Sequence, residues 1–120
     1  MDDELKKLHF TVKHFGINTP SMEEAEKAAG AFNAAFGFEA DRKSASIFST
    51  PYIELMGQVG LGTHGHIAVG TSDIEAARAY LQKKGYSFVE GSERYKDGKL
   101  LTVYLVPEFA GFAVHLLQEN

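Results

Sequence analysis

A segment pattern that occurs twice constrains the fold more than any other feature of this sequence. In each copy a histidine begins a short alternation of bulky apolar residues with small or polar ones, and an amphipathic segment follows; the copies start at His14 and His66. The alternation predicts strands, and the apolar spacing after it predicts helices. Two copies of so long a period do not suit a solenoid, so the sequence indicates an internal duplication of one module.

Each half is predicted to fold as strand, helix, strand, strand, strand. In the first half the expected strands are 13–18, 38–40, 45–49 and 52–56, with the helix over 21–36. In the second half they are 65–70, 86–90, 101–106 and 112–117, with the helix over 72–84. Residues 1–7 are expected to be a frayed end, residues 41–43 a turn, and residues 91–99 a charged hairpin loop.

Capping patterns support both helices. Ser21 and Ser72 each precede a glutamate by three residues, which is the capping-box pattern of a helix start. Gly37 and Gly85 follow the last apolar positions, where a left-handed glycine commonly ends a helix. The chain therefore predicts an α+β fold built from two βαβββ modules.

Both modules are expected to share a single domain, residues 1–120. The first module spans about 12–57, a linker about 58–63 and the second module about 64–118, with the linker in a glycine-rich run. A chain of 120 residues suits one domain with a sizeable core.

Composition excludes several classes of partner and chemistry. The net charge is −4 and no basic run occurs, which argues against nucleic acid as the main partner. Without cysteine, a thiol nucleophile and a thiolate metal site are excluded. Neither a signal-peptide pattern nor a membrane-spanning run is found. We therefore expect a soluble cytoplasmic protein that acts on a small molecule, without a membrane partner.

Strand alternation predicts a polar face and an apolar face for the expected sheets. On the first strand of each half, Phe15 with Ile17 and Ile67 with Val69 are bulky and are expected to face a helix. The alternate positions are small or polar, which is typical of a cleft. Four potential ligands are predicted on that concave side: His14, Glu54, His66 and His115.

These features resemble the vicinal oxygen chelate superfamily, which includes glyoxalase I, methylmalonyl-CoA epimerase, bleomycin-resistance proteins and extradiol dioxygenases. The resemblance covers about residues 12–118. It rests on the paired modules and on three short runs: His14-Phe15-Gly16-Ile17, His66-Ile67-Ala68-Val69 and Tyr52-Ile53-Glu54-Leu55. It implies an eight-stranded, incompletely closed barrel with helices outside, formed within one chain or across a dimer. A homodimer is the expected assembly.

The same resemblance implies one divalent metal ion, held by His14, Glu54, His66 and His115. Imidazole and carboxylate ligands suit Zn²⁺, Ni²⁺, Co²⁺, Mn²⁺ or Fe²⁺. One departure is His115, because the last strand of the family often supplies a glutamate. The alternative interpretation is that the histidines only satisfy hydrogen bonds in a core. His64 and His9 are expected to be exposed.

The leading hypothesis for function is a metal-dependent lyase or isomerase of the glyoxalase or epimerase kind. It would act on a small α-oxygenated acid, ketone or thioester through an enolate, and the base would be Glu54 released from the metal or a metal-bound hydroxide. Tyr52, Tyr104 and Arg94 are candidate substrate-binding residues. One alternative is an extradiol-type dioxygenase with Fe²⁺.

The other alternative is a non-catalytic ligand-binding domain. The run from Gly65 and the run from Gly111 resemble an accessory domain attached to some bacterial 2-dehydro-3-deoxy-phosphogluconate aldolases. The aldolase itself is an (α/β)₈ barrel, which needs about 200 residues or more. The chain is too short to be that barrel.

Overall fold

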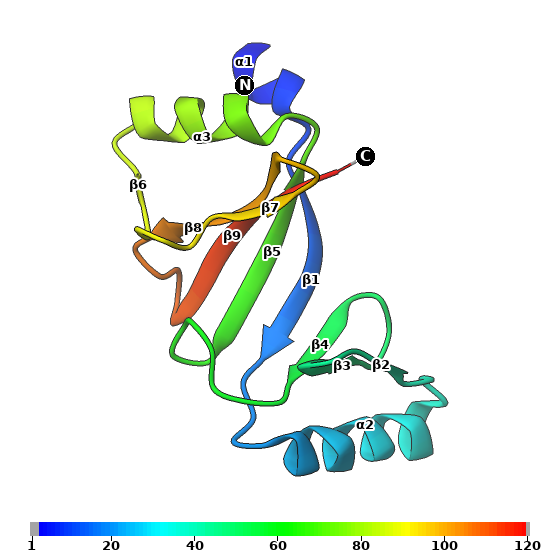
Figure 1. The fold of residues 1–120 in the computed structure, drawn as a ribbon. Helices are drawn as coiled ribbons and strands as arrows, with labels where there is room; N and C mark the ends of the chain where they lie inside the picture. Colours follow the sequence, from blue (N-terminus) through cyan, green and yellow to red (C-terminus); the bar gives the residue numbers. More distant parts are fainter. Residues whose placement is uncertain (1–2, 120) are drawn as a thin grey trace.

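The strands of both halves join in one sheet, with a helix beside each end of it (Figure 1). The structure, a computed structural model, describes residues 3–119. The helices are α1 (Asp3–Leu8), α2 (Met22–Phe36) and α3 (Ile74–Lys83). The strands are β1 (Thr11–Ile17), β2 (Asp41–Arg42), β3 (Ser46–Phe48), β4 (Ile53–Met56), β5 (Gly65–Thr71), β6 (Ser87–Phe88), β7 (Arg94–Lys96), β8 (Lys99–Val106) and β9 (Phe112–Gln118).

The two halves meet in the middle of the sheet. The strand order is β2-β3-β4-β1-β5-β9-β8-β6, and β7 pairs with β8. Within each half the first and last strands pair in parallel, β1 with β4 and β5 with β9. Strands β1 and β5 pair antiparallel, so the two repeated segments lie side by side and form the seam between the halves.

The predicted α+β fold is confirmed, and the sheet is open rather than closed into a barrel. Among residues 3–119 it has nine strands instead of eight, because residues 94–96 form β7 inside the segment expected to be a loop. Asp97 and Gly98 both have positive φ angles, 53° and 76°, which match the tight hairpin turn between β7 and β8.

Helix α2 has the predicted ends. The Glu24 backbone N–H donates to Ser21 Oγ, and Gly37 adopts a left-handed conformation whose N–H donates to the Asn33 carbonyl. Its small residues Ala25 and Ala29 lie against the sheet. The buried cluster that they form with the sheet is compact: Ala25, Ala29, Ile47 and Leu55.

Helix α3 begins one residue later than predicted. Asp73, not Ser72, is the N-cap and accepts a hydrogen bond from the Ala76 backbone N–H. The Ser72 hydroxyl instead lies within hydrogen-bonding distance of His9 and donates to the Lys7 carbonyl, which ties the helix start to the N-terminal segment.

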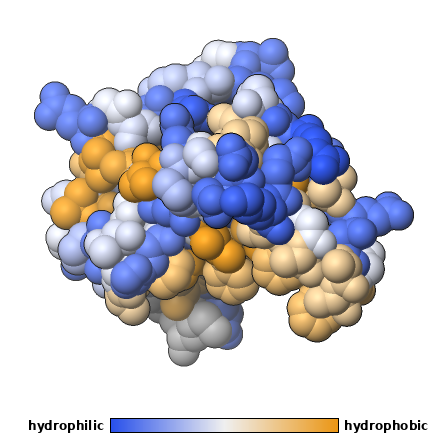
Figure 2. Space-filling model, turned by 90° about the horizontal axis from the view of Figure 1, so that it is seen from below, coloured by the Kyte–Doolittle hydropathy of each residue, from blue (hydrophilic) through white to orange (hydrophobic). Residues whose placement is uncertain are grey.

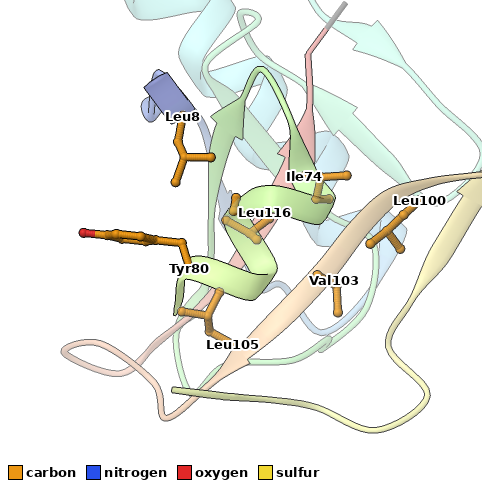
Figure 3. Close-up of a cluster of buried hydrophobic side chains, with 8 residues drawn as sticks. Leu8, Ile74, Tyr80, Leu100, Val103, Leu105 and Leu116 are labelled. Carbon is orange, nitrogen blue, oxygen red and sulfur yellow. The ribbon is translucent and has the colours of Figure 1, made fainter. Parts of the chain in front are cut away.

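The core of the second half, drawn in Figure 3, has eight buried residues among those described, against four in the cluster of the first half. Its buried residues come from α1, α3, β8 and β9: Leu8, Ile74, Ala77, Tyr80, Leu100, Val103, Leu105 and Leu116. The prediction of a frayed end over residues 1–7 was wrong for the described part, because α1 delivers Leu8 to this core. Residues 1 and 2 lie outside the described residues.

Two other boundaries were also misplaced. Residues 38–40 form no strand; β2 is Asp41–Arg42, where a turn was expected. Phe38 packs its ring against Phe32 and Phe36 at the end of α2, at centroid distances of 6.2 and 5.5 Å. This aromatic contact keeps the chain near the helix until the strand begins.

No helix in the described part of the chain covers the outer face of β1. Helix α2 contacts β3 and β4, and α3 contacts β8 and β9, so the middle of the sheet lies between them. Phe15 and Ile17 are 45% and 39% exposed, which contradicts the expectation that they face a helix.

The space-filling view from below shows separate hydrophobic patches among hydrophilic residues (Figure 2). None of the helices in residues 3–119 is long and apolar enough to cross a membrane.

Candidate metal centre

Four neighbouring strands bring the predicted ligands together on the inner face of the sheet. The register places Glu54 and His66 on either side of Gly16, and His14 and His115 on either side of Ala68. In each of these two rows across the strands, a small residue separates two large side chains. A Cβ atom on Gly16 would collide with the His66 ring, so the absence of a side chain there creates the space that this ring fills.

Three of the predicted ligands form a compact triangle. His66 Nε2 lies 3.1 Å from Glu54 Oε1, and His14 Nε2 lies 3.3 Å from the same oxygen. The two Nε2 atoms are 3.4 Å apart. His115 completes a second set with His14 and His66, in which one nitrogen from each ring lies within 4.8 Å of the others.

These residues fit a divalent metal ion. Zinc bonds to histidine and carboxylate are about 2.0–2.2 Å long, so two donors of one tetrahedral ion lie roughly 3.4 Å apart. The spacings of 3.1, 3.3 and 3.4 Å among the three donor atoms agree with this value. Imidazole and carboxylate are also the donors that borderline divalent ions prefer.

Glu54 is held in its charged form. Burial opposes the charge, but contacts with His14 and His66 and a hydrogen bond from Ser46 outweigh burial and keep the pKa of the carboxyl below its usual range. The Ser46 hydroxyl donates to Oε2 at 2.7 Å, which leaves Oε1 directed at the two imidazoles. A carboxylate that stays ionised is a competent metal ligand.

His115 is held neutral. Burial lowers its pKa to about 4, against an opposing contribution from the hydrogen bond to the Leu116 carbonyl. This carbonyl lies 3.0 Å from Nδ1 and can only accept, so Nδ1 carries the proton and Nε2 keeps its lone pair. Metal-binding histidines are commonly oriented by such a hydrogen bond on their other nitrogen.

A cavity of about 530 Å³ lies over these side chains. Its walls include Phe48, Met56, Leu61, Arg94, Thr102, Tyr104 and Leu117, together with His14, Glu54, His66 and His115. The Tyr104 ring lies 4.9 Å from that of His115. Burial and the charge of Glu54 raise the pKa of Tyr104, so its phenol is a proton donor at neutral pH.

The structure does not bring every sequence-predicted site residue into this cavity. Tyr104 and Arg94 line it, but Tyr52 is 66% exposed and is not among the lining residues. His64 is exposed and rests against the Phe112 ring, 5.8 Å between centroids. His9 is exposed and lies beside Ser72.

Sequence reasoning missed Ser46, Gly16 and Phe48 as parts of the site. The Phe48 ring meets the His14 ring edge-on at 5.4 Å. Strand alternation could have placed Ser46 and Phe48 on one face of their strand. Their pairing with Met56 and Glu54 depends on the register between β3 and β4, which no local pattern specifies.

Comparison with known proteins gives a family. The family model described as Glyoxalase/Bleomycin resistance protein/Dioxygenase superfamily matches residues 3–113. A search of curated proteins finds no significant match.

Solved structures share the fold at low sequence identity. A methylmalonyl-CoA epimerase in complex with methylmalonyl-CoA and NH4+ is 19% identical, with 91% of this chain and 94% of that chain covered and a TM-score of 0.63. The hypothetical protein BH1468 from Bacillus halodurans C-125 is 16% identical, with coverages of 93% and 96% and a TM-score of 0.64. Methylmalonyl-CoA epimerase from Mycobacterium tuberculosis is 16% identical, with coverages of 91% and 87% and a TM-score of 0.61.

Proposed function

Because the chain belongs to the Glyoxalase/Bleomycin resistance protein/Dioxygenase superfamily, we propose that it is a metal-dependent isomerase or lyase of the glyoxalase or epimerase kind. Its substrate would be a small α-oxygenated acid, ketone or thioester that loses a proton from carbon. The observation that carries the proposal is the convergence of three imidazoles and one carboxylate in a single cavity. Five of the solved structures with this fold are complexes of methylmalonyl-CoA epimerases with acyl-CoA compounds, which agrees with enolate chemistry.

His14, Glu54, His66 and His115 would hold the metal ion. A bound divalent ion supplies Lewis-acid stabilisation of negative charge on the oxygens of a substrate. The chain supplies the remaining parts of the site. Tyr104 can donate its phenolic proton to a substrate oxygen, and the apolar side chains of Phe48 and Met56 also line the cavity.

Glu54 is the proposed base, and its surroundings allow its proton affinity to change. While its Oε1 faces two imidazoles, the lowered pKa makes it a weak base. If the carboxylate turns from the imidazoles toward the substrate, it loses the two imidazole contacts that lower its pKa. Burial alone favours the protonated acid, so the turned carboxylate accepts a proton more readily.

Metal binding is the first test. Purified protein freed of metal is titrated with Ni²⁺ and Zn²⁺ by calorimetry, with one ion per chain expected. His66→Gln should abolish tight binding, whereas His64→Gln, which changes an exposed histidine two residues away, should bind like the wild type. Absence of stoichiometric binding by the wild type would refute the proposal. Organic-ligand binding that is indifferent to metal would favour the non-catalytic alternative.

Proton abstraction is the second test. The metal-loaded protein is incubated in D2O with methylmalonyl-CoA and with small 2-hydroxy and 2-oxo acids. NMR should show deuterium entering the carbon next to the carbonyl in at least one of them, and Glu54→Gln should abolish the exchange while the fold is retained. Exchange at an equal rate in Glu54→Gln would remove Glu54 from the role of base.

An Fe²⁺ dioxygenase is the second candidate, and the compact triangle favours it specifically. His14, His66 and Glu54 form a two-histidine, one-carboxylate set, which is the ligand set of many non-haem iron oxygenases. His115 counts against it, because a fourth protein ligand leaves fewer positions for substrate and oxygen. Oxygen uptake with catechol by the Fe²⁺-loaded protein, with no exchange in D2O, would replace the first proposal with this one.

A further inference from the structure

Among the described residues, one exposed cationic side chain without an ion-pair partner lines the cavity. Of the residues that line the cavity, Arg94 is the only lysine or arginine, and none of the hydrogen bonds or ion pairs found in residues 3–119 engages its guanidinium. The neighbouring Glu93 carboxylate is bound to Arg78 Nη2 at 3.0 Å, and Arg78 is held in turn over the Phe88 ring. The acid beside Arg94 therefore already has a cationic partner.

Strand register places Arg94 two strands away from His115, on the same sheet as the metal centre. Arg94 pairs with Thr102, Thr102 pairs with Leu117, and Leu117 follows His115 by two residues on the same face of β9. Two strand spacings and one two-residue step separate Arg94 from His115, which gives roughly 12 Å between their Cα atoms. Both side chains line the same space, so a molecule only a few carbons long can reach both.

We propose that Arg94 binds a second carboxylate of the substrate, so that the substrate class is a short α-oxygenated dicarboxylic acid or its derivative. This inference rests on the proposed function, because it assumes that the α-oxygenated end lies at the metal centre. The guanidinium presents a planar fork of N–H donors that matches a carboxylate in two parallel hydrogen bonds. The apolar side chains of Phe48, Met56 and Leu117 suit the short hydrocarbon between the two polar ends.

Tyr104 lies between the two ends of this arrangement. It pairs with His115 across β8 and β9, and Arg94 is near enough to act on its phenol electrostatically. A substrate held by Arg94 at one end and by the metal centre at the other would pass beside the Tyr104 hydroxyl. The metal centre, the Tyr104 hydroxyl and the Arg94 guanidinium could thus each contact a different part of the same small acid.

A matched pair of acids tests the proposal. Malate and 2-hydroxybutanoate share the α-hydroxy acid end and differ in a terminal carboxylate against a methyl group; 2-hydroxyglutarate extends the diacid by one carbon. Binding of each is measured by calorimetry with and without Ni²⁺. We expect at least one diacid to bind the wild type about 10-fold or more tighter than 2-hydroxybutanoate, which corresponds to a charged hydrogen-bonded contact.

Two variants assign that preference to Arg94. Arg94→Gln should bind diacid and monoacid alike while keeping the Ni²⁺ affinity of the wild type. Lys96→Gln removes the same charge from the same strand, but Lys96 is not among the lining residues, so its preference for diacid should be unchanged. Arg94→Lys should retain part of the preference, because the charge remains and the fork is lost.

The outcomes separate this inference from the proposed function. Equal binding of diacid and monoacid by the wild type, or an unchanged preference in Arg94→Gln, overturns the role of Arg94. Loss of coenzyme A binding in Arg94→Gln with no effect on diacids would also overturn it, in favour of a phosphate contact. A wild type that binds no Ni²⁺ but prefers diacids through Arg94 would overturn the proposed function, while the contact between Arg94 and a carboxylate would stand.

Discussion

The two halves of the chain share one order of elements but bury their parts of the candidate site to different depths. His66 and His115 of the second half are both buried, at 5% and 6% exposure. Their counterparts in the first half, His14 and Glu54, have side chains that are 15% and 16% exposed. The larger core also lies in the second half. The second half therefore forms the more buried wall of the site, and the first half forms the more exposed one.

Core truncation should reveal the largest difference between the halves. Leu116→Ala removes a buried side chain from the eight-residue cluster, and Leu55→Ala removes one from the four-residue cluster. Such substitutions cost about 2–5 kcal/mol, and we expect about 4 for Leu116 and about 2 for Leu55, because half-buried neighbours of the small cluster can move into the space. Urea unfolding of both variants measures the two values. Equal losses of unfolding free energy would mean that the two clusters do not differ in their contribution to stability.

Gly16→Ala should disturb the packing of β1 against His66 of β5 at the metal centre. The new methyl group would collide with the His66 ring and displace it, although no ligand is removed. Metal affinity should fall by more than about 100-fold, beyond the usual effect of altering a residue that only orients a ligand. Gly30→Ala in α2 is the matched control, because a Cβ there meets no neighbour within 4 Å. Calorimetry with Ni²⁺ compares the two.

Lowering the pH should reduce the free energy of unfolding of the metal-free protein, because His115 is buried. Burial lowers its folded pKa to about 4 from 6.5, so between these values the unfolded chain binds more protons and the free energy of unfolding falls with pH. Glu54 contributes only below its ordinary pKa of 4.5, where its stabilising contribution begins to be lost. From about pH 7 to 5 we expect a loss of about 1–2 kcal/mol from this histidine.

Urea unfolding at both pH values checks this expectation, with His115→Gln as the comparison. The variant should lose less stability than the wild type over the same interval, because glutamine has no proton to gain. An equal loss in both proteins would mean that other groups cause the pH dependence.

The smallest effect is expected on the more exposed side of the site. Ser46→Ala removes the hydrogen bond to Glu54 Oε2 and frees the carboxylate to rotate away from the imidazoles. Metal affinity should fall by about 10-fold, as for other residues that orient a ligand. Ser49→Ala is the control, since this nearby buried hydroxyl has no hydrogen-bond partner among the described residues. An unchanged affinity in Ser46→Ala would mean that Glu54 is oriented by the histidines alone.

The sequence predicts the framework of the fold because the duplication and the helix caps are local patterns. Ser21 and Gly37 specify both ends of α2 through contacts within a few residues. The misplaced elements depend on distant contacts instead. Helix α1 is stabilised by the position of Leu8 in the core of the second half, and the Ser72 hydroxyl bonds to residue 7 rather than to its own helix.

The grouping of the histidines could be predicted from local strand patterns, whereas the roles of Tyr52, Gly16 and Ser46 could not. Alternation on single strands places His14, His66 and His115 on one face, and the structure shows that they are near each other. Tyr52 precedes β4 in a turn, so strand alternation does not apply to it. Gly16 and Ser46 act through the register between strands, which depends on the whole sheet.

The seam between β1 and β5 makes the candidate site the joint property of two halves that are linked by a short glycine-rich segment. An ion held by residues from both halves would oppose the separation of β1 from β5, because that separation would release the ion. Each tenfold rise in free metal above its dissociation constant would then oppose that separation by about 1.4 kcal/mol. A bound ion would therefore stabilise the pairing of β1 with β5 beyond what the sheet supplies alone.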